Sequence, residues 1–398
     1  MGHVQDRWWK EEIDPATQKV TRIKTSSYGK GLRYKARYLD PQGNEKSKSF
    51  PDRQKKRADD FLLEVESDKR EGKYVSPSAG RRKFKEQAEN WIKSQSSDAA
   101  SREAIQSRLD SHINPHFGNL PVGKIKPATV RDWLGLLDAE RLSENYKTVL
   151  FTTVSSVLDS AVEDRLIIEN PCKAKTIKRP TSISPDIAVW PEERVLELEG
   201  SIEPRFAIVC PLGAGCGLRQ GEILALSPDD VDEERMLLIV QRQLRVVGRR
   251  LVFAPPKGGK RRTVPLASGV LRAIREHEKL FPSAEVTLPW KTPEGVPTTA
   301  RLLATGPNGR VYTGDLFHKV VWLGAFREAG LIYRNRADGM HALRHFYAST
   351  LLSRGVSVKE LAEYLGHSDP GFTLRTYTHL VPSSHERARE AINAVFTS

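Results

Sequence analysis

The sequence is poor in sulfur and has no long apolar run. Its three cysteines, Cys172, Cys210 and Cys216, form no C-x-x-C pair, and their spacing does not suit a set of metal ligands. We therefore expect reduced thiols in or near the core of a cytosolic protein. No apolar stretch approaches the ~20 residues that cross a bilayer. The longest such stretch, residues 206–218, is interrupted by one proline and three glycines.

Signatures of several other protein classes are also missing. The N-terminus reads M-G-H-V-Q-D-R-W-W, which lacks the apolar segment of a signal peptide, and Asp6 disrupts a myristoylation pattern. The sequence has no G-x-x-x-x-G-K-[ST] phosphate-binding loop. It also has no cluster of carboxylates suited to two metal ions. The last two absences agree with a reaction that needs no metal, nucleotide or other cofactor.

Positive charge is the abundant feature. Lysine and arginine number 63 against 50 aspartates and glutamates, which gives a formal net charge of +13 over 398 residues. Such an excess predicts a polyanionic partner, with nucleic acid as the first candidate and an anionic membrane surface as the alternative. The length indicates two or three domains.

Side chains suited to catalysis gather in residues 341–379. His341 and Arg344 are three residues apart and share one face of a predicted helix. A second helix is expected at residues 358–365 and ends at Gly366, which suits the left-handed turn past a helix end and places His367 in that turn. Tyr377 follows ten positions later. Two histidines alone suggest a metal, but arginine and tyrosine in their company suit a phosphodiester instead.

The spacing H-x-L-R-H, then G-H-S, then Y-T-H resembles that of the tyrosine recombinases, the phage integrase family. The family also requires an upstream arginine followed by an acid, which the stretch G-C-G-L-R-Q-G-E provides as Arg219 and Glu222. It further requires a lysine on a β-hairpin between the two motifs. Residues 255–266 resemble that hairpin, with Lys257 as the lysine. Lys260 competes for the role because this hairpin is slightly tighter than is usual in the family.

The resemblance implies a role for the tyrosine and the arginines. Tyr377 would attack phosphorus, and because a free phenol has a pKa of ~10 it needs nearby cations or a proton acceptor to activate it. Arg219 and Arg344 would each offer paired donors to the non-bridging oxygens, where negative charge develops.

The remaining residues of the set would assist. Lys257 would protonate the departing 5′ oxygen, as the resemblance implies. His341 and His367 suit proton handling and oxygen contact, since a free imidazole has a pKa near neutrality. Glu222 would hold the site in shape without touching phosphate. No residue is assigned to a metal.

Residues 1–75 resemble the arm-type DNA-binding domain of lambda-type integrases. We expect a three-stranded sheet, from strands at 31–39, 46–50 and 20–25, and a basic helix at 53–71. Alternation along the first strand gives it one basic face. The resemblance implies DNA contacts from Arg33, Lys35 and Arg37. The alternative is a solvated strand face that keeps a sheet edge from pairing.

Two further domains are predicted after this one. Residues 80–178 read as an all-helical, SAM-like core-binding domain with Lys147 as a candidate phosphate contact, and residues 185–398 as a mixed α+β catalytic domain. Residues 282–315 have no assigned chemistry. The fold class is therefore multidomain and mainly α with small antiparallel sheets. A last helix is expected after Ser383 or Ser384, and its apolar stripe would dock on a neighbouring subunit or fold onto its own domain.

The resemblance implies a phage or prophage integrase that cuts and rejoins DNA through a 3′-phosphotyrosyl intermediate. Its partners would be double-stranded DNA with core-type and arm-type attachment sites, three further copies of the chain in a tetramer, a host DNA-bending protein and an excision factor. It would act in the cytoplasm of a bacterial host, at the nucleoid. The alternatives are the integrase of a conjugative element, a resolvase of the same family, a type IB topoisomerase and a non-catalytic DNA-binding regulator.

Overall fold

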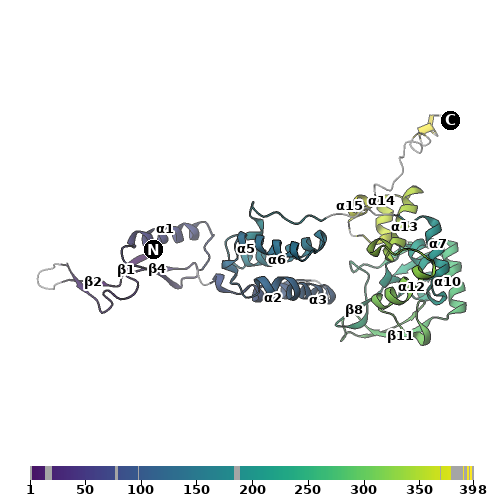
Figure 1. Cartoon of the computed structure of the whole chain (residues 1–398), viewed down its shortest axis with the longest axis horizontal. Helices are drawn as coiled ribbons and strands as arrows, with labels where there is room; N and C mark the ends of the chain where they lie inside the picture. The colour runs from purple at the N-terminus through teal and green to yellow at the C-terminus, as the bar shows by residue number, and fades with distance from the viewer. Residues whose placement is uncertain are drawn as a thin grey trace. The chain divides into compact units, whose positions relative to one another are not determined.

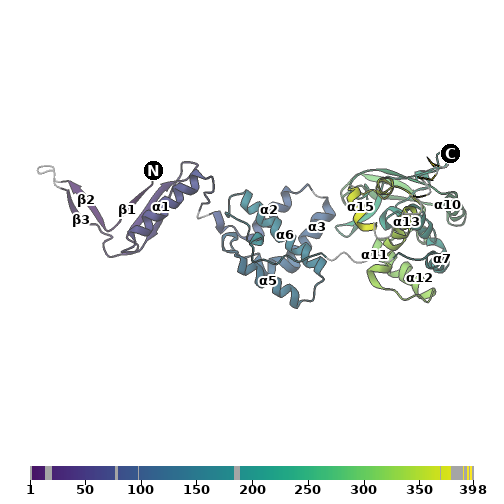
Figure 2. The same cartoon turned by 90° about the horizontal axis from the view of Figure 1, so that it is seen from above.

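A computed structural model of the protein describes residues 2–13, 20–76, 79–96, 98–182, 189–367 and 369–377, with residues 389, 392, 393, 395 and 396. It separates into two compact units, one built from residues 1–97 and 104–183 and the other from residues 98–103 and 184–398. The predicted fold class, mainly helical with small antiparallel sheets, is confirmed (Figures 1 and 2). No helix in the described ranges is long and apolar enough to cross a membrane.

The chain begins with a three-stranded antiparallel sheet covered on one face by a helix. The strand order is β1 (His3–Asp6), β4 (Tyr34–Leu39) and β5 (Glu45–Phe50), and the helix is α1 (Lys55–Arg70). Because successive side chains of a strand point to opposite faces, the buried Tyr34, Ala36 and Tyr38 lie toward α1. Lys35 and Arg37 therefore lie on the opposite face, as the alternation predicts.

The strand expected at residues 20–25 forms but belongs to a different sheet. It is β3 (Val20–Lys24), which pairs with β2 (Trp9–Ile13) in a separate two-stranded ribbon. The third strand of the sheet formed by β4 and β5 is instead β1, which pairs with β4. The physical reason is burial: β1 brings Val4 to the cluster under α1, whereas every residue of β3 is exposed and adds nothing to that core.

Residues 84–163 are helical, as predicted. The elements are α2 (Phe84–Ser94), α3 (Ala99–Arg108), a π-helical turn (Leu109–Ile113), α4 (Asn114–Phe117), α5 (Pro127–Ala139) and α6 (Glu144–Glu163). The Ser143 hydroxyl accepts a hydrogen bond from the Tyr146 backbone N–H and so fixes the start of α6. Apolar residues at helical spacing along α6 pack into a core with Phe117 and Trp133.

The second unit combines nine α-helices and seven strands among its described residues. The helices are α7 (Glu192–Ser201), α8 (Val209–Cys216), α9 (Gln220–Ile223), α10 (Ser268–Leu280), α11 (Gly314–Phe317), α12 (Leu323–Glu328), α13 (His341–Ser353), α14 (Val358–Leu365) and α15 (Pro370–Tyr377). The strands are β6 (Val231–Asp232), β7 (Leu237–Val240), β8 (Gln243–Val247), β9 (Arg250–Ala254), β10 (Arg262–Pro265), β11 (Ala284–Pro289) and β12 (Pro297–Leu302). They form sheets in the orders β10-β7-β6, β8-β9 and β11-β12.

The hairpin predicted at residues 255–266 is not formed. β9 pairs with β8 and β10 pairs with β7, so β9 and β10 lie in different sheets. Lys257 instead lies in a turn closed by a 2.8 Å hydrogen bond from the Gly259 N–H to the Pro256 carbonyl. Gly258 and Gly259 have φ of +90° and +74°, which only glycine adopts readily. This glycine pair lets the chain leave one sheet and enter the other.

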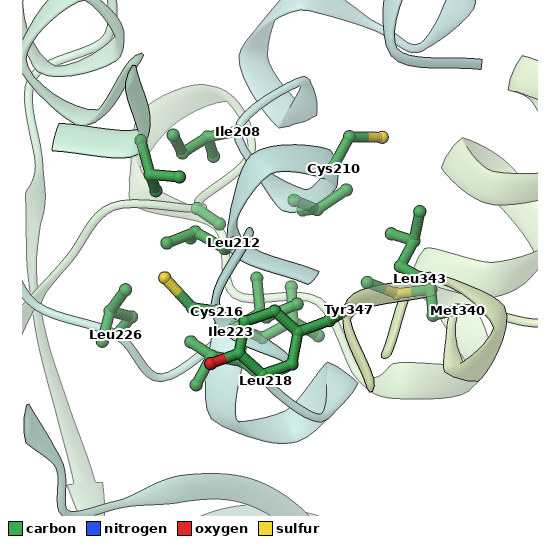
Figure 3. Packing of buried hydrophobic residues seen from close by; sticks show 14 of the residues in the cluster. Ile208, Cys210, Leu212, Cys216, Leu218, Ile223, Leu226, Met340, Leu343 and Tyr347 are labelled. Atoms are coloured by element: carbon green, nitrogen blue, oxygen red, sulfur yellow. The ribbon is translucent and has the colours of Figure 1, made fainter. Parts of the chain in front are cut away.

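The core of the second unit brings α8 and α13 together. Figure 3 shows Leu212 and Cys216 from α8 in one buried cluster with Leu343 and Tyr347 from α13. The approach is close because Gly213 has no side chain, and a Cβ there would lie 2.7 Å from Leu343 Cδ1. Since Arg344 follows Leu343 and Arg219 follows α8, this packing fixes two candidate residues relative to one another.

The second unit also contains residues 282–315 and the C-terminal segment. Within residues 282–315, to which no chemistry was assigned, the antiparallel β11–β12 hairpin forms, with the Thr287 and Thr299 hydroxyls 2.8 Å apart. The predicted C-terminal helix lies mostly outside the described residues. Of its apolar stripe, Ile392, Val395 and Phe396 are described, and all three are exposed. The three cysteines are buried and free.

Candidate active site

Arg344 is the buried centre of the site. Its side chain lies on α13 with no solvent exposure. Nη1 donates a 2.7 Å hydrogen bond to the Gly217 carbonyl at the end of α8, and Nη2 donates a 2.5 Å bond to the Leu365 carbonyl at the end of α14. Burial and the nearby Arg219 lower its pKa to about 9, so the guanidinium stays charged at neutral pH. Arg344 therefore joins three helices with a fixed cation.

Glu222 links the upstream motif to a strand that carries another arginine. The chain leaves α8 through Gly217 in a left-handed conformation, and Arg219 then begins α9. The Glu222 carboxylate accepts bonds from the Arg219 backbone N–H at 2.9 Å and from Arg219 Nη1 at 3.0 Å. It also accepts two bonds from Arg262 on β10. Burial alone would raise the pKa of Glu222, but Arg262 and Arg219 lower it to about 2.

Arg262 is a further residue of the site that the sequence motifs did not single out. Its Nε donates a 2.7 Å hydrogen bond to the Tyr364 carbonyl near the end of α14, while its other nitrogens bind Glu222. The left-handed Gly366 is required beside it, because a Cβ there would lie 2.9 Å from Arg262 Cδ. The stretch K-R-R-T-V-P-L could have pointed to an arginine here, but the neighbouring sequence does not distinguish Arg262 from Arg261.

His367 follows Gly366 in the predicted turn. Its Nδ1 lies 2.7 Å from the buried Thr373 hydroxyl and its Nε2 lies 3.1 Å from Arg344 Nη2. Because Arg344 can only donate, Nε2 accepts and the ring proton belongs on Nδ1. Burial and the cations Arg344, Arg219, Arg262 and Lys257 lower the pKa of His367 to about 4, so the ring is neutral at pH 7.

Tyr377 ends α15 and is almost completely buried. Its hydroxyl lies 2.8 Å from Nδ1 of His345, a residue of α13 to which the motif spacing gave no role. Burial raises the pKa of Tyr377, and the cations Arg344 and Arg219 oppose the rise. Burial and Arg344 lower the pKa of His345 to about 4. The sequence feature that could have indicated His345 is the second histidine of the H-x-L-R-H motif.

His341 and Lys257 lie at the margin of this cluster. His341 is exposed at the start of α13, yet desolvation and its neighbours His345, Arg344 and Arg219 lower its pKa. The His341 and His345 rings meet edge to face with centroids 5.0 Å apart. Lys257 and Lys260 are both exposed in the turn before β10. The charge of Lys257 contributes to the lowered pKa of His367, which favours Lys257 as the lysine of the site.

The candidate DNA contacts of the first unit are mostly engaged by carboxylates. Arg33 binds Asp6 at 2.8 Å and Asp52 at 2.9 Å, and Arg37 lies 3.2 Å from Glu45. Lys147 is buried, and its ammonium lies 2.5 Å from oxygens of both Asp138 and Glu144. Lys35 forms no ion pair with any described residue. Contact between these four residues and DNA stays a prediction.

The assembled site suits chemistry at a phosphodiester. Hydrogen bonds join Glu222 to Arg219 and to Arg262, and a further bond joins Arg344 to His367. His345 forms a separate hydrogen bond with Tyr377. Within the described residues, no group of three or more histidine, cysteine, aspartate and glutamate side chains is arranged to hold a metal ion. The arrangement provides fixed cations, neutral imidazoles and a buried phenol hydroxyl.

Comparison with known proteins agrees with this chemistry. The family model described as phage integrase family matches residues 198–383, and that of the phage integrase central domain matches residues 84–176. A tyrosine recombinase XerC-like protein of Caldanaerobacter subterraneus subsp. tengcongensis is 27% identical over 305 residues, covering 71% of this chain and 74% of the relative. The integrase of Mycobacterium phage D29 is 26% identical over 311 residues, which is 76% of each protein.

Solved structures share the fold. The Tn1549 transposon integrase in complex with transposon right end DNA has a TM-score of 0.64 at 18% identity, covering 79% of this chain and 99% of the solved one. A lambda integrase tetramer bound to a Holliday junction has a TM-score of 0.55 at 15% identity, covering 84% and 93%. At these identities the likeness concerns the fold alone.

Proposed function

The chain belongs to the phage integrase family of tyrosine recombinases, which cleave and rejoin DNA, and we propose that it integrates or excises a phage or prophage genome at attachment sites. The observation that supports the assignment of residues to this reaction is a buried hydrogen-bond donor without a partner. Arg344 Nε is buried and has no hydrogen-bond partner among the described residues. A buried unpaired donor costs about 1–3 kcal/mol. A phosphate oxygen of bound DNA would remove that cost.

In the proposed reaction Tyr377 is the nucleophile. Its Oη forms a bond to phosphorus while the bond from phosphorus to the 5′ oxygen breaks, which leaves a 3′-phosphotyrosyl link and a free 5′ hydroxyl. Arg219 and Arg344 stabilise the charge on the non-bridging oxygens. Arg219 is suited to this because Glu222 engages only its Nη1 and backbone N–H. Lys257 protonates the 5′ oxygen, and the covalent link preserves the phosphodiester energy for rejoining.

The histidines and Glu222 complete the proposed site. His367 presents a neutral ring that Thr373 orients, and it contacts Arg344. His341 lies at the solvent side, where it would contact a phosphate oxygen of bound DNA. Glu222 orients Arg219 and remains charged, consistent with a supporting role. This assignment leaves every member of the predicted set with a role in one reaction.

We propose double-stranded DNA as the partner and a homotetramer as the working form, with a host DNA-bending protein and an excision factor as accessory partners. The net charge of +13 supports a polyanionic partner. A groove on the second unit supports assembly. It is lined by α7, α8 and Phe346 and contains Val195, Leu196, Cys210 and Pro211. The exposed Ile392 and Phe396 of a second copy suit that apolar surface.

The charges of Glu199 and Arg389 also favour docking of the C-terminal segment of one copy in the groove of another. Glu199 lines the groove, and its pKa is raised by burial alone, with no ion pair to a described residue. Arg389 precedes Ile392 and is exposed. We therefore propose that Arg389 of one copy approaches Glu199 of another as the apolar side chains dock. The integrase of a conjugative or transposon-like element is the second candidate, supported by the fold shared with the Tn1549 transposon integrase.

A trapping assay tests the reaction. Purified protein is mixed with a nicked duplex that carries the junction DNA of the element, in EDTA, and the products are separated on a denaturing gel. We expect a covalent protein–DNA adduct that Tyr377→Phe abolishes while DNA binding persists. An adduct that survives in Tyr377→Phe would refute the nucleophile assignment. Tight binding without any adduct on junction DNA would favour a non-catalytic regulator.

A further inference from the structure

We propose that His345 is the general base that removes the proton of the Tyr377 hydroxyl during strand cleavage. The proposal rests on the proposed function and adds a catalytic residue to it. The Nδ1 atom of His345 lies 2.8 Å from Tyr377 Oη, within the range for direct proton transfer. Both residues belong to well-packed helices, with Tyr377 almost fully buried. The contact therefore joins the last residue of α15 to α13, and α14 packs against both helices.

The other histidines are less suited to this step. His367 uses Nδ1 for the Thr373 hydroxyl and Nε2 for Arg344, so both ring nitrogens are already engaged. His341 is exposed and meets His345 edge to face, at a centroid distance of 5.0 Å. Of the histidines in the described ranges, His345 is the one with a hydrogen bond to the phenol.

The surroundings keep His345 able to accept a proton. The titratable and charged groups that face it are Tyr377 from α15 and His341 and Arg344 from its own helix. Burial and Arg344 lower its pKa to about 4, so the ring is neutral at physiological pH. Burial raises the pKa of Tyr377, so the phenol does not ionise unaided at that pH. A neutral acceptor beside an un-ionised nucleophile meets the requirement for general base catalysis.

The proton and the electron pairs balance. As Oη of Tyr377 bonds to phosphorus, its proton passes to Nδ1 of His345, which becomes an imidazolium. The electron pair of the breaking bond goes to the 5′ oxygen, which takes a proton from Lys257. The phosphodiester carries one negative charge before and after. When a 5′ hydroxyl attacks in the rejoining step, its proton returns to Lys257, and His345 returns its proton to the tyrosine oxygen.

His345→Asn separates proton acceptance from positioning. An asparagine amide reaches the position of Nδ1 and retains a hydrogen bond to the phenol, but it takes up no proton near neutral pH. We expect the first-order rate of adduct formation on the nicked duplex to fall by about 10²–10⁴-fold, with unchanged DNA binding and thermal unfolding. A His345→Asn rate within about threefold of wild type, which is small beside that range, would overturn the proposal.

A second histidine–tyrosine pair, outside the candidate site, provides the control. His318 is also half-buried, and its Nε2 lies 3.4 Å from the Tyr333 hydroxyl, outside the candidate site. We expect His318→Asn to cleave at the wild-type rate. If His318→Asn is as slow as His345→Asn, the loss reflects disturbed packing and the proposal fails.

The pH profile gives a readout that a structural role would not change. Between about pH 6 and pH 8.5 the wild-type His345 is neutral, so its protonation does not limit the rate. In His345→Asn the phenol must ionise before it attacks, and the rate should rise by about tenfold per pH unit. Parallel profiles for the two proteins would contradict proton transfer to His345.

A sulfur leaving group distinguishes the base from the acid. Replacing the bridging 5′ oxygen with sulfur gives a leaving group that needs no proton, because a thiol is far more acidic than an alcohol. We expect this substrate to restore cleavage by Lys257→Ala but not by His345→Asn. Rescue of His345→Asn would place its defect at the leaving group and overturn the assignment. Failure of the wild type to form any adduct would instead count against the proposed function itself.

Discussion

Arg262 and Glu222 form a buried ion pair that connects two parts of the site 40 residues apart. Nη1 of Arg262 donates to one carboxylate oxygen at 2.9 Å, and Nη2 donates to the other at 2.7 Å. Glu222 also holds Arg219, and Arg262 also binds the Tyr364 carbonyl before His367. The pair therefore sets the distance between the upstream arginine and the turn that carries the histidine.

Removing Arg262 should be costly for stability. In Arg262→Ala the Glu222 carboxylate stays buried with less compensation, and such losses typically cost about 3–5 kcal/mol. We expect a correspondingly lower urea midpoint and a slower cleavage rate. The control is Arg275→Ala, which breaks an exposed ion pair with Glu233 and should leave the midpoint unchanged. Equal midpoints for the two variants would show that the buried pair adds nothing.

As the pH falls, the second unit should first lose stability because its buried histidines are protonated more readily when the chain unfolds. The pKa values of His345 and His367 are about 4 in the folded protein, below the ordinary value of 6.5. The unfolded chain therefore binds more protons between these values, so stability is complete above about pH 6.5 and falls as the pH drops toward 4. Glu222, with a pKa of about 2, loses its contribution only below about pH 4.5.

Urea unfolding at a series of pH values tests this order. Wild-type stability should decrease between about pH 6.5 and pH 5, and the decrease should be smaller in His345→Asn, which removes one of the titrating groups. A stability profile that is flat over this interval, or a slope that His345→Asn leaves unchanged, would show that the buried imidazoles do not titrate as inferred.

Local patterns predicted much of this site, and tertiary packing supplied the rest. The left-handed Gly366, the turn at His367 and the buried face of β4 follow from glycine chemistry and from residue periodicity. The contact between His345 and Tyr377 does not, because it depends on how α15 packs against α13. The same holds for Arg262 and Glu222, which no helical or strand spacing relates.

Local sequence patterns likewise do not predict which sheet a strand joins. Residues 20–24 have a strand pattern, but which partner they pair with depends on competition for the edge of β4. β1 takes that edge because it brings an apolar side chain to the cluster beneath α1. The turn around Lys257 has the glycines of a hairpin, yet the strands on its two sides find partners elsewhere.

Asp338 anchors the segment that enters α13. Its buried carboxylate accepts bonds from the Trp190 indole at 3.1 Å and from the Arg334 backbone N–H at 2.7 Å, and Arg194 lies 3.1 Å away. We expect Asp338→Asn to lower the free energy of unfolding by about 3 kcal/mol, since it leaves Arg194 without its partner. Because α13 begins three residues later, at His341, cleavage should also slow.

The surface variant Asp315→Asn is the control for this prediction. Asp315 is exposed and pairs with Lys319 one turn along the helix. Chemical denaturation and the trapping assay should leave this variant indistinguishable from wild type. If Asp338→Asn behaves in the same way, the aspartate is not an anchor of α13.

Lys257 and Lys260 occupy the same turn, and cleavage should depend on the first. Lys257 affects the pKa of His367, which places its charge near the site. We expect Lys257→Ala to slow adduct formation by about 10²–10⁴-fold, the usual contribution of a general acid. Lys260→Ala serves as the matched variant and should remain within about threefold of wild type. The reverse order of the two rates would move the acid to Lys260.

Assembly through the C-terminal segment predicts a charge-reversal rescue. Glu199→Lys in the groove and Arg389→Glu in the tail should each weaken tetramer formation on DNA, because each places like charges together in the proposed contact. Glu197→Lys, on the exposed side of the same helix, should not. Combining the two reversals should restore the tetramer, as measured by mass photometry on junction DNA. Failure of the double variant to assemble, with each single variant folded, would favour a tail that packs against its own subunit.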